Sequence, residues 1–174
     1  FKLKDPSQQF SADVAKGSII AALDGKGAPL PVKYPEGGEV QFVVSLGAVP
    51  AVAGLSVADA TKALTDAGLV VGATSEEFSD SVPKGSVISL SLPEGPATKG
   101  TNVTLVVSKG EDLVEVPNVI GMSITDGGAA LTAKGFGFTS NAPGAYWNDL
   151  KVKSQTPSAG DRVKRGTTVS INNP

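Results

Sequence analysis

The strongest constraint on the fold of this chain is a stretch of sequence that occurs twice. Residues 48–110 and 111–174 share one order of features: a Val-Pro segment, a glycine, a helix-like pattern, a polar stretch and a β-prone run. The landmarks lie 67 positions apart, namely Pro50 and Pro117, Gly54 and Gly121, Leu64 and Leu131, and Gly68 and Gly135. A constant offset over this length indicates a duplicated domain. We therefore expect two domains of similar fold.

Residues 1–47 match only the back half of this repeat. Gly17 corresponds to Gly85 and Gly47 to Gly110, whereas the Val-Pro segment and the helix pattern have no counterpart. We interpret residues 1–47 as a partial unit whose front half lies outside the sequence. The predicted domains are thus 1–47, 48–110 and 111–174, the last being the C-terminal unit.

Each complete repeat predicts one short helix and several strands. Ser56 is a typical N-cap residue, Asp59 follows in the first turn, and Gly68 can end the helix in the left-handed conformation. Residues 87–92 and 102–107 are β-prone and flank a turn rich in Pro and Gly. Short strands need a cover for their apolar face. We predict an α+β fold of tandem small domains, each with one helix packed on a three-stranded, mostly antiparallel sheet.

The two repeats differ in the predicted quality of the helix. In the second copy, after Ser123, Gly127 and Gly128 enter the first turns. Each glycine costs about 1 kcal/mol relative to alanine in a helix interior. We expect this helix to be less stable than that of residues 56–67. Short linkers containing Pro50 and Pro117 restrict the backbone between units and predict an extended chain.

The composition leaves little room for catalysis. The chain has no histidine and no cysteine, which excludes Ser-His and Cys-His pairs and the usual zinc ligands. The acidic clusters, Glu76-Glu77 with Asp80 and Glu111-Asp112, fall in predicted loops and linkers, where we interpret them as solvated charges. The glycine-loop, HRD and DFG signatures of a protein kinase do not occur. We expect no catalytic residue, no metal site and no cofactor.

The ordered elements VPxVxG, a helix ending in glycine, KGxV, a Pro-x-x-Gly turn and VxLxVSKG resemble the PASTA domain. The resemblance covers nearly all of residues 48–174 and part of 1–47. It implies one helix against a three-stranded sheet, and a place outside the cell membrane, in the wall of Gram-positive, actinobacterial-type bacteria. It also implies binding of peptidoglycan fragments (muropeptides) or the lipid-linked cell-wall precursor.

The resemblance implies two kinds of parent protein. One is a membrane-spanning Ser/Thr protein kinase, whose repeated ectodomains sense the ligand, self-associate and so promote kinase clustering and activation. The other is a penicillin-binding protein with a C-terminal PASTA region. Three units in series favour the kinase, and a ligand-free wall spacer is a further alternative. We expect no nucleic-acid partner, because the net charge is −2 and no recognition motif occurs.

One loop of the last unit carries the candidate ligand site. Tyr146 and Trp147, the only tryptophan, could stack on sugar rings, and nearby basic side chains could bind a carboxylate, best through an arginine fork. Gln155 precedes Pro157, as is frequent in the family. The predicted ligand-binding residues are Tyr146, Trp147, Lys151, Lys153, Gln155, Arg162 and Arg165. The alternative is that Trp147 packs on a thin core and the basic residues form a solvated strand face.

Overall fold

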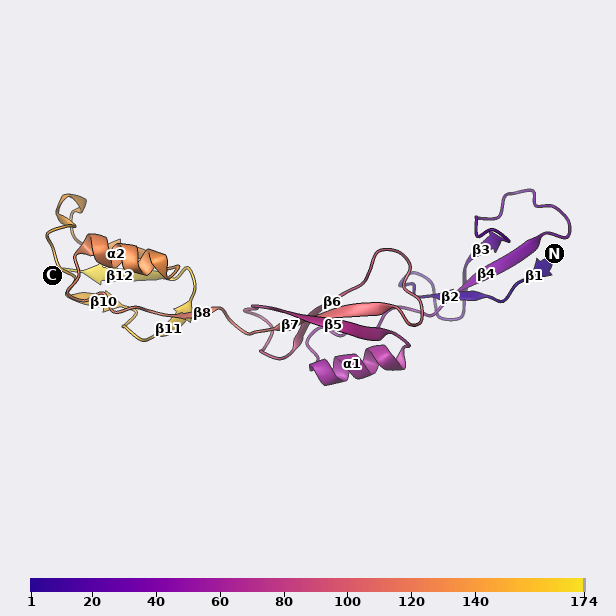
Figure 1. Cartoon of the computed structure of the whole chain (residues 1–174), viewed down its shortest axis with the longest axis horizontal. Coiled ribbons are helices and arrows are strands. Elements are labelled where there is room, and N and C mark those ends of the chain that lie inside the picture. Colours follow the sequence, from indigo (N-terminus) through magenta and orange to yellow (C-terminus); the bar gives the residue numbers. More distant parts are fainter. Residues whose placement is uncertain (174) are drawn as a thin grey trace. The chain divides into compact units, whose positions relative to one another are not determined.

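The computed structural model describes residues 1–173 and divides into two compact units, residues 1–110 and 111–174 (Figure 1). Pro174, the last residue of the predicted 111–174 domain, lies outside the described residues. The first unit begins with strands β1 (Lys2–Leu3), β2 (Ser7–Gln9), β3 (Ile19–Asp24) and β4 (Glu39–Ser45). It continues with helix α1 (Val57–Asp66) and strands β5 (Val70–Glu77), β6 (Val87–Ser91) and β7 (Asn102–Ser108).

The second unit repeats the helix and its three strands and adds a small strand pair. Its repeated elements are α2 (Ile124–Ala133), β9 (Gly137–Ser140), β10 (Ser154–Thr156) and β12 (Thr168–Asn172). A one-turn 3₁₀ helix, η1 (Gly144–Tyr146), lies in the loop after β9. Two further strands, β8 (Leu113–Glu115) and β11 (Arg162–Lys164), pair antiparallel with each other.

The helices begin as the sequence predicts. The Ser56 hydroxyl oxygen accepts a hydrogen bond from the Asp59 backbone N–H at 3.1 Å, and the hydroxyl donates to the Asp59 carboxylate at 2.7 Å. Ser123 makes the same two bonds with Asp126 at 3.0 and 2.7 Å. In each helix the bond from the aspartate N–H satisfies a backbone donor that the first turn leaves without a partner. Gly68 has a φ of +91° just beyond α1, a conformation that glycine adopts without steric cost.

The predicted α+β fold is confirmed, but the sheets are mixed where a mostly antiparallel sheet was expected. In residues 48–110 the order is β5-β7-β6, with β7 parallel to β5 and antiparallel to β6. The order β10-β12-β9 in the second unit follows the same rule. In each sheet the last strand along the chain lies between the other two. It runs parallel to the first strand and antiparallel to the second.

The same sheet topology occurs in residues 1–47. Strand β4 pairs in parallel with β1 and β2, which follow one another along the same edge, and antiparallel with β3 on the other edge. No helix precedes this sheet within the described residues. Several large apolar side chains that the equivalent sheet buries are therefore exposed here, notably Phe1, Leu3 and Ile19.

Each complete repeat has its own hydrophobic core. The core of residues 48–110 is aliphatic and comprises Val52, Ala60, Leu64, Leu69, Val87, Val103, Leu105 and Val107. The second core comprises Val116, Val119, Ile124, Leu131, Phe136, Val152, Val169 and Ile171, with Phe138 and Trp147 packed against it. The helix covers one face of the sheet in both repeats (Figure 1). No helix among residues 1–173 is long and apolar enough to cross a membrane.

Candidate functional site

Six of the seven predicted ligand-binding residues fall into two groups within the second unit, and Gln155 lies apart from both. The first group lies at the start of α2, where the Thr125 N–H donates to the Trp147 carbonyl at 3.2 Å and Lys151 forms a β-bridge with Ser123. The second group lies at the β8–β11 pair, beyond the other end of the helix. There the Arg165 guanidinium donates to the Lys134 carbonyl at 3.4 Å. A helix of 10 residues is about 15 Å long, so the groups form no single small pocket.

The loop between β9 and β10, residues 141–153, caps α2. The backbone carbonyl of Leu150 accepts from the Ile124 N–H at 3.1 Å, next to the bond from Thr125 to Trp147. The Asn148 side-chain oxygen accepts from the Thr125 hydroxyl at 2.7 Å. These contacts use the donors that a helix N-terminus could offer to an anion. The loop therefore binds the helix itself, and ligand contacts must come from its outer side chains.

Trp147 is the anchor of this loop. The indole N–H donates to the Ala142 carbonyl at 2.8 Å, and the ring lies 5.6 Å from Phe138 at an interplanar angle of 56°. A tilted pair at this separation is a favourable arrangement of aromatic rings. The side chain is half-buried and packs against the core. Of the two roles left open for Trp147, these contacts describe the packing role.

The exposed side chains of the first group are Tyr146, Lys151 and Lys153. The Tyr146 side chain, next to the anchored Trp147, is 56% exposed. Lys151 and Lys153 are exposed on either side of Val152, which is buried. Extended chain points alternate side chains to opposite sides, which explains why one buried residue lies between two exposed lysines. A ligand on this surface would therefore meet one aromatic ring and two ammonium groups.

Gln155 has a different environment. The residue is only 8% exposed, and its side-chain oxygen accepts from the Val119 N–H at 2.9 Å. Its amide nitrogen donates to the Pro117 carbonyl at 3.0 Å and to the Pro157 carbonyl at 3.5 Å. The whole amide thus connects the Val-Pro segment to β10. We leave Gln155 out of the ligand-contacting group below, because a buried and fully used amide has nothing to offer a ligand.

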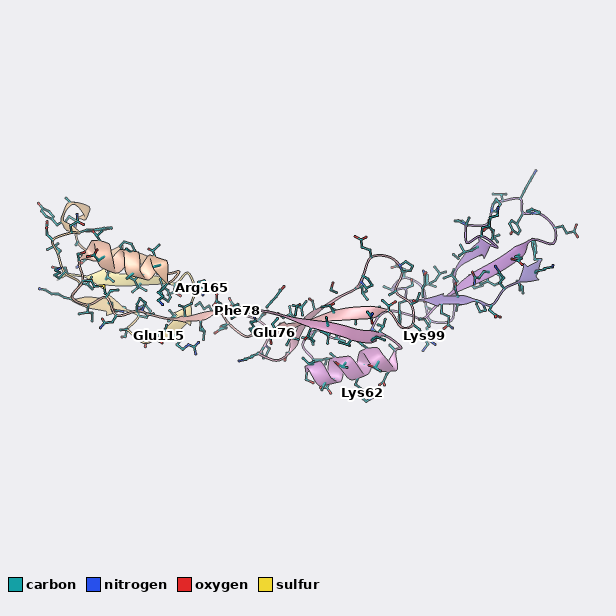
Figure 2. All side chains as sticks on the ribbon, in the orientation of Figure 1. Lys62, Glu76, Phe78, Lys99, Glu115 and Arg165 are labelled. Carbon is teal, nitrogen blue, oxygen red and sulfur yellow. The ribbon has the colours of Figure 1, made fainter. Side chains whose placement is uncertain are left out.

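The second group is largely engaged with acidic residues of the linker. Arg165 donates through Nε to the Asp112 carboxylate at 2.7 Å, and Lys164 lies 3.1 Å from the Glu111 carboxylate. Glu111 and Asp112, interpreted above as solvated charges, are therefore paired. Figure 2 labels Arg165 and Glu115 at this end of the unit. Within residues 1–173 the Arg162 side chain has no hydrogen bond or ion pair, and it lies opposite Glu115 in the strand register.

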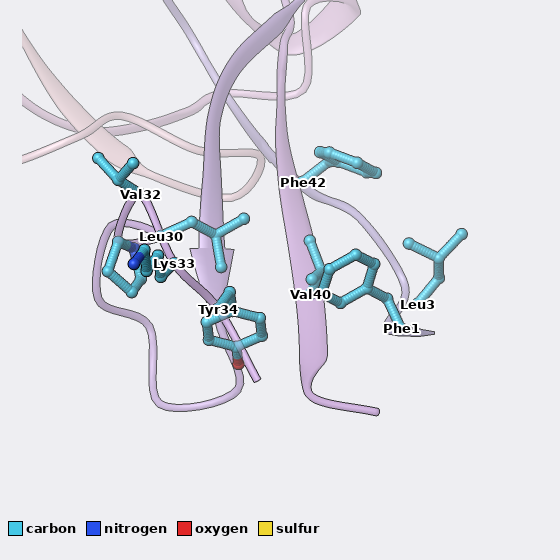
Figure 3. Close-up of a pocket in the computed structure, with 9 residues that line it drawn as sticks. Phe1, Leu3, Leu30, Val32, Lys33, Tyr34, Val40 and Phe42 are labelled. Atoms are coloured by element: carbon cyan, nitrogen blue, oxygen red, sulfur yellow. The ribbon is translucent and has the colours of Figure 1, made fainter. Parts of the chain in front are cut away.

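An apolar cavity of about 620 Å³ lies on the sheet of residues 1–47 (Figure 3). It is lined by Phe1, Leu3, Leu30, Pro31, Val32, Lys33, Tyr34, Val40 and Phe42. Phe42 holds the register position that Leu105 holds in β7, where α1 covers the sheet. The Tyr34 hydroxyl donates to the Glu39 carbonyl at 2.8 Å. The cavity thus lies on the sheet face that α1 covers in the next repeat. It lacks the converging polar groups of a catalytic pocket.

Asp24 and Lys62 each have a shifted pKa. Backbone N–H donors from Ala28 and Lys26 lower the pKa of Asp24, and the hydrogen bond from Lys62 to Asp66 raises the pKa of Lys62. Both directions favour the charged form, as expected in a surface turn and a surface ion pair, so neither group becomes an acid or base suited to neutral pH. No cluster of acidic residues among residues 1–173 could hold a metal ion.

Comparisons with known proteins agree with this architecture. The PASTA domain family matches residues 47–109 and 114–172. A probable serine/threonine-protein kinase of Corynebacterium efficiens is 34% identical over 171 residues, which cover 92% of this chain and 24% of the relative. A probable serine/threonine-protein kinase of Corynebacterium glutamicum is 31% identical over 170 residues, covering 94% of this chain and 26% of the relative. The chain therefore spans about a quarter of the length of these relatives.

A solved structure is also similar in fold. The crystal structure of the three-PASTA-domain of a Ser/Thr kinase from Staphylococcus aureus aligns with a TM-score of 0.58 and 24% identity. The alignment covers 99% of this chain and 87% of that chain. At this level of identity the likeness supports the fold of the repeats and nothing more specific.

Proposed function

We infer that this chain, which belongs to the PASTA domain family, is the non-catalytic extracellular sensor region of a membrane-spanning Ser/Thr protein kinase. One observation carries the proposal. Two PASTA matches in series lie inside a continuous similarity to probable Ser/Thr kinases that covers 92% and 94% of the chain. The expected location is the outer face of the membrane, in the cell wall of a Gram-positive, actinobacterial-type bacterium.

The proposed ligands are peptidoglycan fragments or the lipid-linked cell-wall precursor. Both join sugar rings to a short peptide that carries carboxylates. Tyr146 offers an exposed ring for a sugar, and Lys151 and Lys153 offer charge for a carboxylate. Trp147 supports this surface by holding the loop against the core. Arg162 is a separate contact for a longer ligand, since it lies beyond the opposite end of α2, whereas Arg165 is engaged by Asp112.

Signalling would then depend on association. A module that only binds can change the activity of a kinase domain elsewhere in its chain if ligand binding favours one assembly of the receptor. A ligand that favours paired ectodomains raises the effective concentration of the attached kinase domains. We propose that clustering of this kind promotes activation.

The direct test is a calorimetric titration of the whole chain with synthetic muropeptides that carry either diaminopimelate or lysine in the stem peptide. We expect binding that weakens about tenfold in Tyr146→Ala and in Lys151→Ala, a loss equivalent to roughly 1.4 kcal/mol. Phe78→Ala and Lys84→Ala are matched controls, because they remove an exposed ring and an exposed lysine from the other unit. Sedimentation velocity with and without ligand tests the association.

The outcomes separate the site from the function. Binding that is equal in all variants would reject the Tyr146 surface and leave the sensor function standing. No binding of any muropeptide or lipid-linked precursor at millimolar concentration would reject the sensor function and favour a wall spacer.

A further inference from the structure

Residues 1–47 and 48–110 meet at a joint that lies within the first compact unit, residues 1–110. The Phe10 backbone N–H donates to the Ala97 carbonyl at 2.7 Å, and the Phe10 ring packs against the core of residues 48–110. The joint brings the C-terminal end of α1 close to the strands of residues 1–47, so that both border one cavity.

This joint cavity has a volume of about 430 Å³. Sites for small ligands typically have volumes of about 300–1,000 Å³. The cavity is lined on one side by β2, the turn before β3 and the end of β4, and on the other by the last turn of α1 and the turn before β7. Four half-buried side chains form its apolar wall, namely Phe10, Val44, Leu46 and Ala67.

Two ammonium groups border the cavity from opposite sides of the joint. Lys16 belongs to the turn before β3, and Lys99 belongs to the turn before β7. Within residues 1–173 neither lysine side chain has a hydrogen bond or an ion pair. Both charges are therefore available to a ligand.

The aliphatic stems of the two lysines pack over glycines. A Cβ on Gly47 would lie 3.3 Å from the Lys16 Cβ, and a Cβ on Gly68 would lie 3.2 Å from the Lys99 Cγ. Each stem thus lies directly on backbone that carries no side chain. This packing buries part of the stem while the ammonium group stays accessible at the end of it.

The other polar side chains at the cavity complete a site for a peptide carboxylate. The Asp66 carboxylate is already paired, since it accepts a hydrogen bond from the Lys62 ammonium at 2.6 Å. The Gln8 side-chain amide has no hydrogen bond within residues 1–173 and can bond to a peptide group. Two unpaired cations favour a carboxylate, and the apolar wall favours a small alkyl group beside it.

We propose that the joint cavity binds the C-terminal end of a short peptide with small apolar side chains. The terminal carboxylate lies between Lys16 and Lys99, and the terminal side chain lies against the apolar wall. Because the two lysines come from different repeats, the ligand bridges the joint. The proposal does not depend on the Tyr146 surface, which belongs to the second unit.

The test is a ¹H–¹⁵N NMR titration of the whole 174-residue chain with the dipeptide N-acetyl-alanyl-alanine. We expect saturable shifts of the backbone amides of Gly17, Leu46 and Ala67, which line the cavity. Two further probes are matched controls: the dipeptide carboxamide lacks the negative charge, and acetate lacks the apolar side chains. Each control should bind about tenfold more weakly, because it loses either the charge-assisted hydrogen bonds or the apolar contact.

Three variants test the lysines. Lys16→Gln and Lys99→Gln should each weaken binding of the dipeptide about tenfold, and the double variant should abolish it. Lys26→Gln is the matched control, since Lys26 is an exposed lysine of the same unit that does not border the cavity. All three lysines are exposed, so the variants should keep the dispersed amide spectrum of the folded chain.

Several results would overturn the proposal. Equal affinity for the dipeptide and its carboxamide would exclude a role for the two ammonium groups. Acetate that binds as tightly as the dipeptide would exclude a role for the apolar wall. Binding that persists in the double variant, shifts confined to residues 111–173, or no shift at millimolar dipeptide would each reject the site itself.

Discussion

The two complete repeats share the same helix cap and the same sheet topology. They differ in which side chains fill the space between the helix and the sheet. Helix α1 has Ala60 and Thr61 where α2 has Gly127 and Gly128, and the first strand has Val71 where the copy has Phe138. A Cβ on Gly128 would collide with the tip of the Phe138 ring. The ring thus occupies the volume that a side chain on the helix would need.

This difference changes the meaning of the glycines. From propensity alone they weaken α2, by about 1 kcal/mol each. In the structure Gly128 allows a large ring to pack beneath the helix, and that ring contacts Trp147, which anchors the candidate binding loop. Residues 48–110 have an aliphatic core, and the matching strand position carries the smaller Val71. The last repeat therefore combines a helix of lower propensity with a pair of aromatic rings, Phe138 and the half-exposed Trp147, packed against its core.

The largest predicted loss of stability comes from removing the Phe138 ring. Phe138→Ala should cost about 3–5 kcal/mol of unfolding free energy, because it leaves a cavity under α2 and removes the partner of Trp147. Urea unfolding followed by fluorescence reports on the second unit alone, since Trp147 is the only tryptophan.

The control for this change is Val71→Ala at the matching position. It should cost less, because a smaller side chain is removed. The loss can be followed through the amide signals of β5 to β7 in urea. Equal losses in the two repeats would contradict the idea that the last repeat depends on its aromatic core.

A more discriminating change is Gly128→Ala, since propensity and packing predict opposite signs. Propensity predicts a gain of about 1 kcal/mol. Contact of the new methyl group with the Phe138 ring should cost about 1–3 kcal/mol and more than cancel that gain. We expect a net loss, measured by urea unfolding with Trp147 fluorescence.

Two variants sharpen this result. Thr61→Ala, the same position in α1, should gain a few tenths of a kcal/mol from propensity. Adding Phe138→Val to Gly128→Ala imitates the helix–strand pair of the other repeat, so the clash should disappear. If Gly128→Ala is more stable than the unmodified chain, the packing argument is wrong and Gly128 only weakens the helix.

The smallest expected loss of stability concerns the side-chain amide of Gln155, which connects the Val-Pro segment to β10. Gln155→Ser introduces the residue that the other repeat has at Ser91 and removes the acceptor of the buried Val119 N–H. The lost hydrogen bond should cost about 1 kcal/mol. The same fluorescence-monitored unfolding gives the value, and Ser91→Ala, at an exposed position, should change little. No loss in Gln155→Ser would mean that water replaces the amide without cost.

The elements themselves could be predicted because their signals are local. Ser56 and Asp59 lie within one turn, Gly68 follows the last turn directly, and the repeat reveals itself by a fixed offset. Such signals depend on neighbouring residues and therefore survive in the sequence alone. Helix bounds, caps and fold class followed from them. The parallel pairing of β5 with β7 did not, because strand order is set by how distant segments assemble.

The sequence by itself determined the number of complete repeats, the capped helix in each of them and the absence of histidine and cysteine chemistry. Only the tertiary structure decided which side chains are available. It placed Gln155 inside, set Trp147 against Phe138 and paired Arg165 with Asp112. Residue type and local spacing do not reveal which side chains are covered, because burial depends on which distant segments of the chain pack against them.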